Sequence, residues 1–229
     1  MDVPSNAMPR ILVLHGYTQS AKIIREKLVK FLPTLANYIV PDAPLKLDQT
    51  KGVGEEGEEN DDGNKKFGWF PLSKEQLHEN GVVVTEDDVT ILKDYATIHA
   101  WHGHYDAVIA YSQGCLVAQI LLERQIITSA KLLYFCPIPL PVQPLLSLPC
   151  TILTRIYLGG GDIWVPETNT SFIDYHTKSR QAFANDNHLL EIKRHAKGHT
   201  IPVNKPYRTE YGSFLFECEQ HPSATYIMK

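Results

Sequence analysis

The stretch that decides the fold is residues 105–114, which read Tyr105-Asp106-Ala107-Val108-Ile109-Ala110-Tyr111-Ser112-Gln113-Gly114. The apolar run 107–111 predicts a buried strand, because continuous apolar runs are typical of parallel strands that helices cover on both faces. Apolar residues then return at helical spacing, which predicts a helix over 113–124. Ser112 therefore stands in a sharp turn between a strand and a helix.

The rest of the chain repeats this alternation of strand and helix. Further strands are expected at 11–14, 38–40, 131–136, 151–158 and 189–193, and further helices at 20–32, 85–101, from Pro166, and at 202–217. Such alternation is the signature of a parallel α/β sheet. At 229 residues we expect a single domain over residues 1–229.

Ser112 is a candidate nucleophile. A serine between a strand and a helix is typical of a nucleophile elbow, in which a strained turn exposes the hydroxyl. The flanking residues of such a turn must be small, and here they are Ala110 and Gly114. The alternative is that Ser112 only caps the helix that follows.

Asp162 and His199 are candidate partners of Ser112, because each follows a predicted strand. The order Ser, Asp, His along the chain suits a triad in which His199 accepts the serine proton and Asp162 orients the imidazole. Parallel strands end at one edge of the sheet, where α/β proteins bind ligands. The alternatives are a helix cap for Asp162 and a surface side chain for His199.

The segment Leu14-His15-Gly16-Tyr17 follows the first strand. Acyl transfer needs two backbone N–H groups aimed at the oxyanion. The sequence predicts these at Gln113, which follows the nucleophile, and at Tyr17, where Gly16 allows the backbone to come close. An ordinary tight turn is the alternative.

Other histidines give competing readings. His99, His102 and His104 have a spacing that can bind metal, but they precede a strand and are expected at the opposite edge of the sheet. A solvated helix end is the favoured interpretation. His195 is the alternative base.

An acidic insertion is expected at about 45–66, where like charges favour a flexible, solvated loop. Phe67-Gly68-Trp69-Phe70 follows it. Trp69 and Phe70 are candidate substrate-binding residues that would wall an apolar pocket. The alternative is that they anchor the loop to the core.

Composition excludes several classes of protein. Lys+Arg 22 against Asp+Glu 26 gives a net charge of −4, which argues against nucleic-acid binding. No apolar run is long enough to span a membrane, and because residues 1–10 have no apolar segment we expect no secretory signal. Its four scattered cysteines favour a reduced protein. We expect a cytoplasmic location, with a nuclear one as the alternative.

Taken together, these motifs resemble the family of serine hydrolases, the FSH group, within the α/β-hydrolase superfamily. The resemblance covers about 10–217 and rests on residues 14–17, 41–44, 67–70, 105–114, 159–166 and 198–202. It implies a compact α/β-hydrolase sheet of six strands in the order 2-1-3-4-5-6. It also implies a Ser112, Asp162 and His199 triad with an oxyanion hole at Tyr17 and Gln113, and no metal or cofactor.

The resemblance further implies two-step hydrolysis of a small-molecule ester or thioester. Fungal members that act beside polyketide synthases hydrolyse a thioester, so release of an acyl or polyketide chain from a carrier is one alternative. A non-catalytic protein that binds a small molecule is another. A third is recruitment of a protein partner through the acidic residues 55–62.

Overall fold

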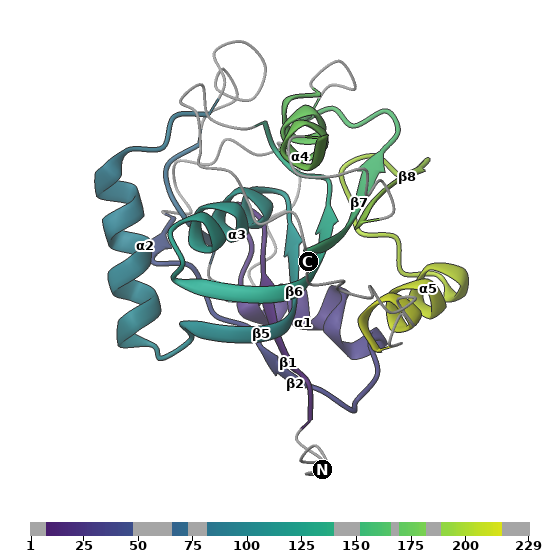
Figure 1. The fold of residues 1–229 in the computed structure, drawn as a ribbon, viewed down its shortest axis with the longest axis horizontal. Coiled ribbons are helices and arrows are strands. Elements are labelled where there is room, and N and C mark those ends of the chain that lie inside the picture. The colour runs from purple at the N-terminus through teal and green to yellow at the C-terminus, as the bar shows by residue number, and fades with distance from the viewer. Residues whose placement is uncertain are drawn as a thin grey trace, which may run out of the picture.

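Six parallel strands form the central sheet of the computed structural model (Figure 1). The structure describes residues 8–47, 66–72, 82–139, 152–165, 170–181 and 189–216. The strands are β1 (Arg10–Leu14), β2 (Asn37–Ile39), β5 (Gly103–Tyr111), β6 (Ile127–Phe135), β7 (Leu153–Gly159) and β8 (Leu190–His195). Their order is β2-β1-β5-β6-β7-β8 and every neighbouring pair is parallel, which confirms the predicted sheet.

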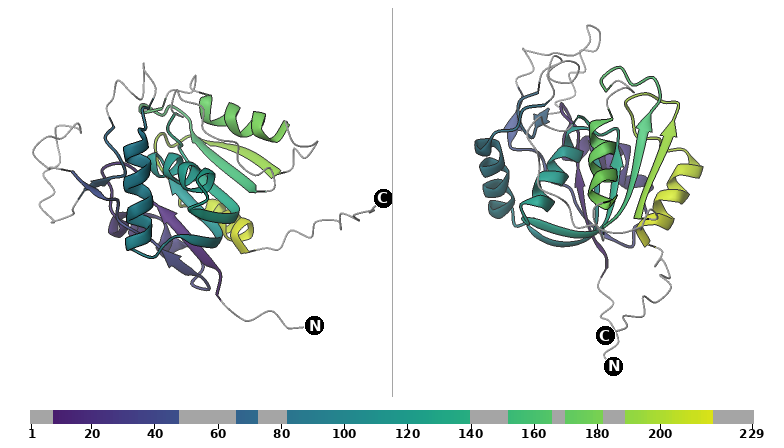
Figure 2. Two further views of the ribbon diagram at one scale, coloured as in Figure 1. Left: turned by 60° about the vertical axis from the view of Figure 1, so that its left-hand side comes forward. Right: turned by 45° about the horizontal axis from the view of Figure 1, so that its top comes forward.

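Helices cover both faces of the sheet. They are α1 (Ala21–Lys27), the short 3₁₀ helix η1 (Val29–Phe31), α2 (Glu86–Ile98), α3 (Gln113–Glu123), α4 (Ser171–Gln181) and α5 (Lys205–Phe216). One face carries α2, α3 and α4, and the other carries α1 and α5 (Figure 2).

Alternating strand residues build the two cores. Along β1, Leu12 and Leu14 join the core under α2, α3 and α4, while Ile11 and Val13 join the core under α1 and α5. All four are at most 1% exposed. Burial on both sides explains why residues 11–14 form an unbroken apolar run.

Local signals set the helix ends. The Ser20 hydroxyl accepts a hydrogen bond from the amide of Ile23 and caps α1. Thr85 and Asp88 form a reciprocal capping box at the start of α2. The helix predicted over 20–32 ends early, at Lys27, and η1 follows it before Pro33. Proline disfavours helical backbone in the residue before it, and Leu32 is accordingly extended, with φ −85° and ψ 157°.

A second, two-stranded sheet was not predicted from the sequence. Its strands β3 (Leu45–Lys46) and β4 (Phe67–Gly68) pair antiparallel and bring the two ends of the acidic insertion together. Residues 48–65 of that insertion lie outside the described residues, as does the predicted helix start at Pro166.

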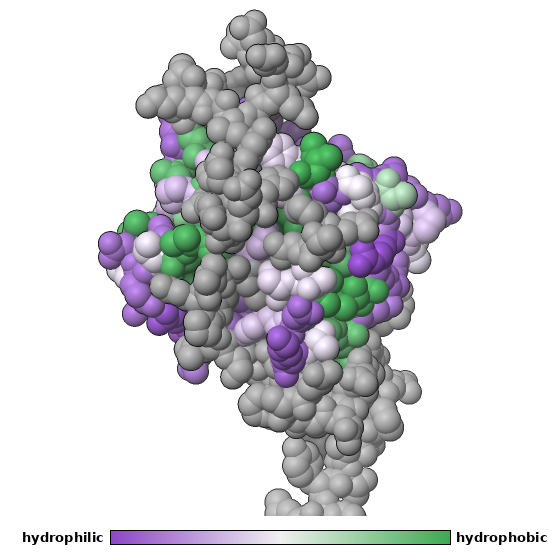
Figure 3. All heavy atoms as spheres, turned by 90° about the horizontal axis from the view of Figure 1, so that it is seen from above, coloured by the Kyte–Doolittle hydropathy of each residue, from purple (hydrophilic) through white to green (hydrophobic). Residues whose placement is uncertain are grey.

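The carboxyl ends of the strands point toward the top of Figure 1. Seen from that side, hydrophobic residues form separate patches among hydrophilic ones (Figure 3). Within the described ranges, no helix combines the length and the apolar character needed to cross a membrane.

Candidate active site

Ser112 stands in a strained turn between β5 and α3. Its φ is 53° and its ψ is −118°, a left-handed backbone that residues other than glycine rarely adopt. The Ser112 side chain caps no amide of α3. The turn therefore has the geometry of a nucleophile elbow rather than that of an ordinary helix cap.

Close packing around the elbow explains its small residues. A Cβ on Gly114 would lie 2.5 Å from the carbonyl oxygen of Leu14, so only glycine lets α3 approach β1 this closely. Ala110 is fully buried in the same core as Leu14. The core accommodates the extra methyl at Ala110 while Ser112 keeps its strained turn.

His199 bridges the other two predicted site residues. Its Nε2 lies 2.8 Å from Oγ of Ser112, and its Nδ1 lies 2.6 Å from Oδ2 of Asp162. The sequence predicts an exposed serine hydroxyl, but Ser112 is only 7% exposed. The difference arises because the imidazole and the backbone of Gly16 both lie against the Ser112 side chain.

Asp162 is held by three donors. Its Oδ1 accepts the amides of Trp164 at 2.8 Å and Val165 at 3.0 Å, while Oδ2 faces His199. Burial alone would raise the pKa of Asp162, but the hydrogen bonds and charge of these partners outweigh burial and place this pKa below its usual value. Asp162 is therefore ionised at neutral pH and can stabilise an imidazolium.

Glycines let the loops that carry Asp162 and His199 cross. A Cβ on Gly159 would lie 1.9 Å from the carbonyl oxygen of Gly198, so no side chain fits there. The Gly198 amide then donates to the carbonyl of Gly160 at 3.2 Å. These contacts set the spacing between the loops of Asp162 and His199.

The two predicted oxyanion donors, Gln113 and Tyr17, belong to segments that adjoin Ser112. Gln113 is the first residue of α3, where amides have no partner within the helix. Tyr17 follows Gly16, and a Cβ on Gly16 would lie only 3.2 Å from Cβ of Ser112. Gln113 therefore follows Ser112 directly, and Tyr17 follows a residue that lies against Ser112.

His15 is a site residue whose role sequence reasoning missed. Its ring is fully buried, its Nε2 accepts the Ala43 amide at 3.1 Å, and its Nδ1 lies 2.8 Å from the carbonyl oxygen of Gly16. Burial lowers the pKa of His15, although the Gly16 carbonyl and Asp42 act in the opposite direction. A neutral ring that donates from Nδ1 satisfies both bonds and fixes the loop before Tyr17. The sequence feature that could have indicated this role is the position of His15 directly before Gly16.

Trp69 and Phe70 are buried, with exposed fractions of 2% and 1%. The side chain of Gln113 accepts the Trp69 amide at 2.9 Å and donates to the Phe70 carbonyl at 2.8 Å. The indole N–H of Trp69 donates to the His15 carbonyl at 2.8 Å. These contacts favour the anchor interpretation over the pocket wall.

Trp69→Ala is expected to cost about 3–5 kcal/mol of stability, because it empties a buried site and leaves the His15 carbonyl without its donor. The melting temperature should fall by roughly 6–20 °C. The ratio of the rates on a two-carbon and an eight-carbon ester should stay unchanged. Trp101→Ala is the control, because Trp101 is equally buried, and it should leave the same ratio unchanged. A Trp69→Ala variant that melts like the parent but loses its chain-length preference would instead support the interpretation of Trp69 as part of a pocket wall.

Two further histidines of the described residues have contacts of their own. Nε2 of His195 faces Sγ of Cys136 at 3.9 Å, and His195 Nδ1 accepts the Lys197 amide at 3.3 Å. His104 lies near the start of β5 and contacts Thr128 on β6. His199, rather than the alternative base His195, contacts the serine.

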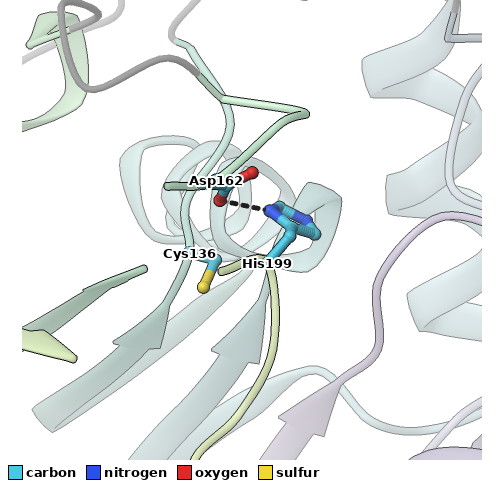
Figure 4. A group of neighbouring side chains, drawn as sticks. All are labelled: Cys136, Asp162 and His199. Atoms are coloured by element: carbon cyan, nitrogen blue, oxygen red, sulfur yellow. Dashed lines mark hydrogen bonds and ion pairs between the residues drawn. The ribbon is translucent and has the colours of Figure 1, made fainter. Parts of the chain in front are cut away.

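One group of possible metal ligands is present among the described residues. Ligand atoms of Cys136, Asp162 and His199 lie within 4.8 Å of one another (Figure 4). However, Asp162 and His199 already bond to each other through these atoms, and the sulfur points away from them. Burial also raises the pKa of the Cys136 thiol to about 12, which disfavours the thiolate that a metal needs. The bond between Asp162 and His199 and the protonated thiol of Cys136 both argue against a metal at this group.

Comparison with known proteins points to hydrolases. The family described as "Serine hydrolase (FSH1)" matches residues 5–132. The "Probable esterase tazC" of Aspergillus terreus is 28% identical over 142 residues, which are 58% of this chain and 51% of that protein. The chain thus matches about half the length of this curated relative.

Solved structures agree on the fold. The structure of YahD with malic acid is 16% identical with a TM-score of 0.60, and the match covers 91% of this chain and 92% of that one. A carboxylesterase of Bacillus cereus is 14% identical with a TM-score of 0.58, covering 92% and 91%. At such identities the likeness concerns the α/β fold alone.

Proposed function

Because the chain belongs to the serine hydrolase (FSH1) family, we propose that it hydrolyses carboxylic esters or thioesters of small molecules through Ser112, His199 and Asp162. The observation that carries this proposal is the pair of hydrogen bonds by which His199 joins Ser112 to Asp162. The strained backbone of Ser112 supports it, since strain of this kind gathers at functional sites.

In the first step, Oγ of Ser112 attacks the carbonyl carbon and His199 Nε2 takes the serine proton. Asp162 stabilises the imidazolium that forms, through the bond at Nδ1. The amides of Gln113 and Tyr17 would bind the oxyanion. The alcohol or thiol then leaves with the proton from His199, and the acyl group remains on Ser112.

In the second step, water attacks the acyl-enzyme. His199 takes a proton from the water as the water oxygen bonds to the carbonyl carbon. The tetrahedral intermediate then collapses with cleavage of its bond to Oγ of Ser112, which receives the proton from His199, and the carboxylic acid is released. None of these steps requires a metal or a cofactor.

A fluorophosphonate probe tests the proposal, because it reacts only with an activated serine. We expect the parent protein to gain one adduct, located on Ser112 by peptide mass spectrometry, and to hydrolyse part of a panel of esters and thioesters of graded acyl length. Comparison of the oxygen and thioester series identifies the preferred leaving group. A protein that takes up no probe and turns over no member of the panel would be a binding protein instead.

A further inference from the structure

Tyr111 contacts three parts of the candidate site at once. It precedes Ser112 at the end of β5, and its hydroxyl donates to the carbonyl of His199 at 2.8 Å. The centroids of the Tyr111 and His199 rings lie 5.4 Å apart. A Cβ on Gly16 would come within 2.9 Å of the Tyr111 ring. Tyr111 thus joins the elbow, the loop before Tyr17 and the loop of the base.

The carbonyl that Tyr111 binds belongs to the base itself. Rotation of that peptide would swing the imidazole relative to Ser112. The Cys136 thiol supports the same loop through longer contacts, 3.7 Å to the carbonyl of Gly198 and 3.5 Å to that of Thr200. Sulfur is a weak donor, so the shorter Tyr111 bond holds the loop more firmly.

Tyr111 is well suited to act as a permanent donor. It is only 8% exposed, and burial raises the pKa of its phenol well above the usual value, so the hydroxyl stays protonated throughout the neutral range. The His199 carbonyl is partly buried, and without its donor it loses a hydrogen bond, which favours a rearranged loop.

We propose that the Tyr111 hydroxyl positions His199 for proton transfer, so that the residue before the nucleophile also sets the orientation of the base. This inference rests on the proposed function, in which His199 is the base. Tyr111 acts through the backbone of His199 and is a positioning residue, not a catalytic one.

Tyr111→Phe removes the hydroxyl and keeps the ring that packs against Gly16. Tyr211→Phe is the matched control, since Tyr211 is fully buried on α5 and its hydroxyl donates to the Pro202 carbonyl at 2.7 Å. Each variant loses one hydrogen bond from a tyrosine hydroxyl to a backbone carbonyl, so both melting temperatures should fall to a similar extent. Only Tyr111→Phe should lower kcat, by about 10-fold with KM unchanged, which is the change that one hydrogen bond explains.

A second measurement does not depend on turnover. The Nδ1 proton of His199 lies in a short bond to Asp162, and such protons give a far-downfield NMR signal that His199→Gln identifies by its loss. The signal should shift or broaden in Tyr111→Phe and stay in place in Tyr211→Phe.

The two readouts separate the possible failures. A parent-like signal and kcat in Tyr111→Phe would overturn the inference, as would equal changes in both variants. If the parent hydrolyses nothing and takes up no fluorophosphonate, the proposed function fails, while the NMR comparison still tests whether Tyr111 positions His199.

Discussion

Ser112→Ala is expected to lower kcat on p-nitrophenyl acetate by about 10⁶-fold, the loss seen when the serine of a well-studied triad is removed. Alanine lacks the oxygen that lies 2.8 Å from Nε2 of His199, so no acyl-enzyme can form. The oxyanion donors and substrate binding would leave only a residual rate. The fluorophosphonate adduct should disappear, while the melting temperature should stay within about 4 °C of the parent because only one hydroxyl is lost.

Ser129→Ala is the matched control for this variant. Ser129 lies on β6 with a similar exposed fraction, 9%, and its hydroxyl donates to the Lys131 carbonyl at 2.9 Å. This variant should keep the parental rate and the probe adduct. Parental turnover by Ser112→Ala would instead show that the nucleophile lies elsewhere.

The inner strands β1 and β5 of the central sheet were predictable because each contains a continuous run of apolar residues. Burial on both faces requires a continuous apolar run, as at Ile11–Leu14 and Ala107–Tyr111, and such runs are visible in the sequence. The starts of β5 and β6 were not predicted. Gly103–Asp106 and Ile127–Ala130 mix polar and apolar residues, so the strands extend beyond their apolar segments.

The small sheet of β3 and β4 could not be predicted in the same way. Each strand has two residues, too few for a periodic pattern, and its pairing closes a long insertion. The role of Trp69 could not be predicted from the sequence either. A tryptophan at this position suits a pocket wall as well as an anchor. The contacts that favour the anchor come from Gln113 and His15, which lie far from Trp69 in the sequence.

The candidate site also has residues that could be predicted from the sequence and residues that could not. Ser112, Asp162 and His199 were predicted to meet because each follows a strand of one parallel sheet, and the structure places them within hydrogen-bond distance. Their catalytic role stays a prediction. The supports provided by His15 and Tyr111 were missed, since each acts on a backbone carbonyl or amide that lies far away in the sequence or in a neighbouring loop. For His15 the sequence offered only its place directly before Gly16, and for Tyr111 only its place directly before Ser112.

Asp162→Asn is expected to lower kcat by roughly 10⁴-fold at neutral pH, as the same change does in the best-studied triad. The structure supplies a reason. The amides of Trp164 and Val165 both donate to Oδ1, so the oxygen of an asparagine must stay at that position. Its NH₂ group then faces Nδ1 of His199 and forces that nitrogen to accept. The imidazole proton moves to Nε2, where it points at Ser112 and removes the base.

The pKa of Asp162 gives this variant a second readout. A carboxyl whose pKa is lower in the folded than in the unfolded protein stabilises the fold above the unfolded value, about 3.9, and this stability is lost as pH falls through the folded pKa. Asp162→Asn should therefore lose less stability than the parent below about pH 4. Asp106→Asn is the control, because Asp106 accepts the Arg10 amide at 2.7 Å near the start of β5. It should keep the parental rate. Near-parental kinetics in Asp162→Asn would mean that His199 needs no carboxylate to hold its tautomer, and the triad would reduce to a Ser–His pair.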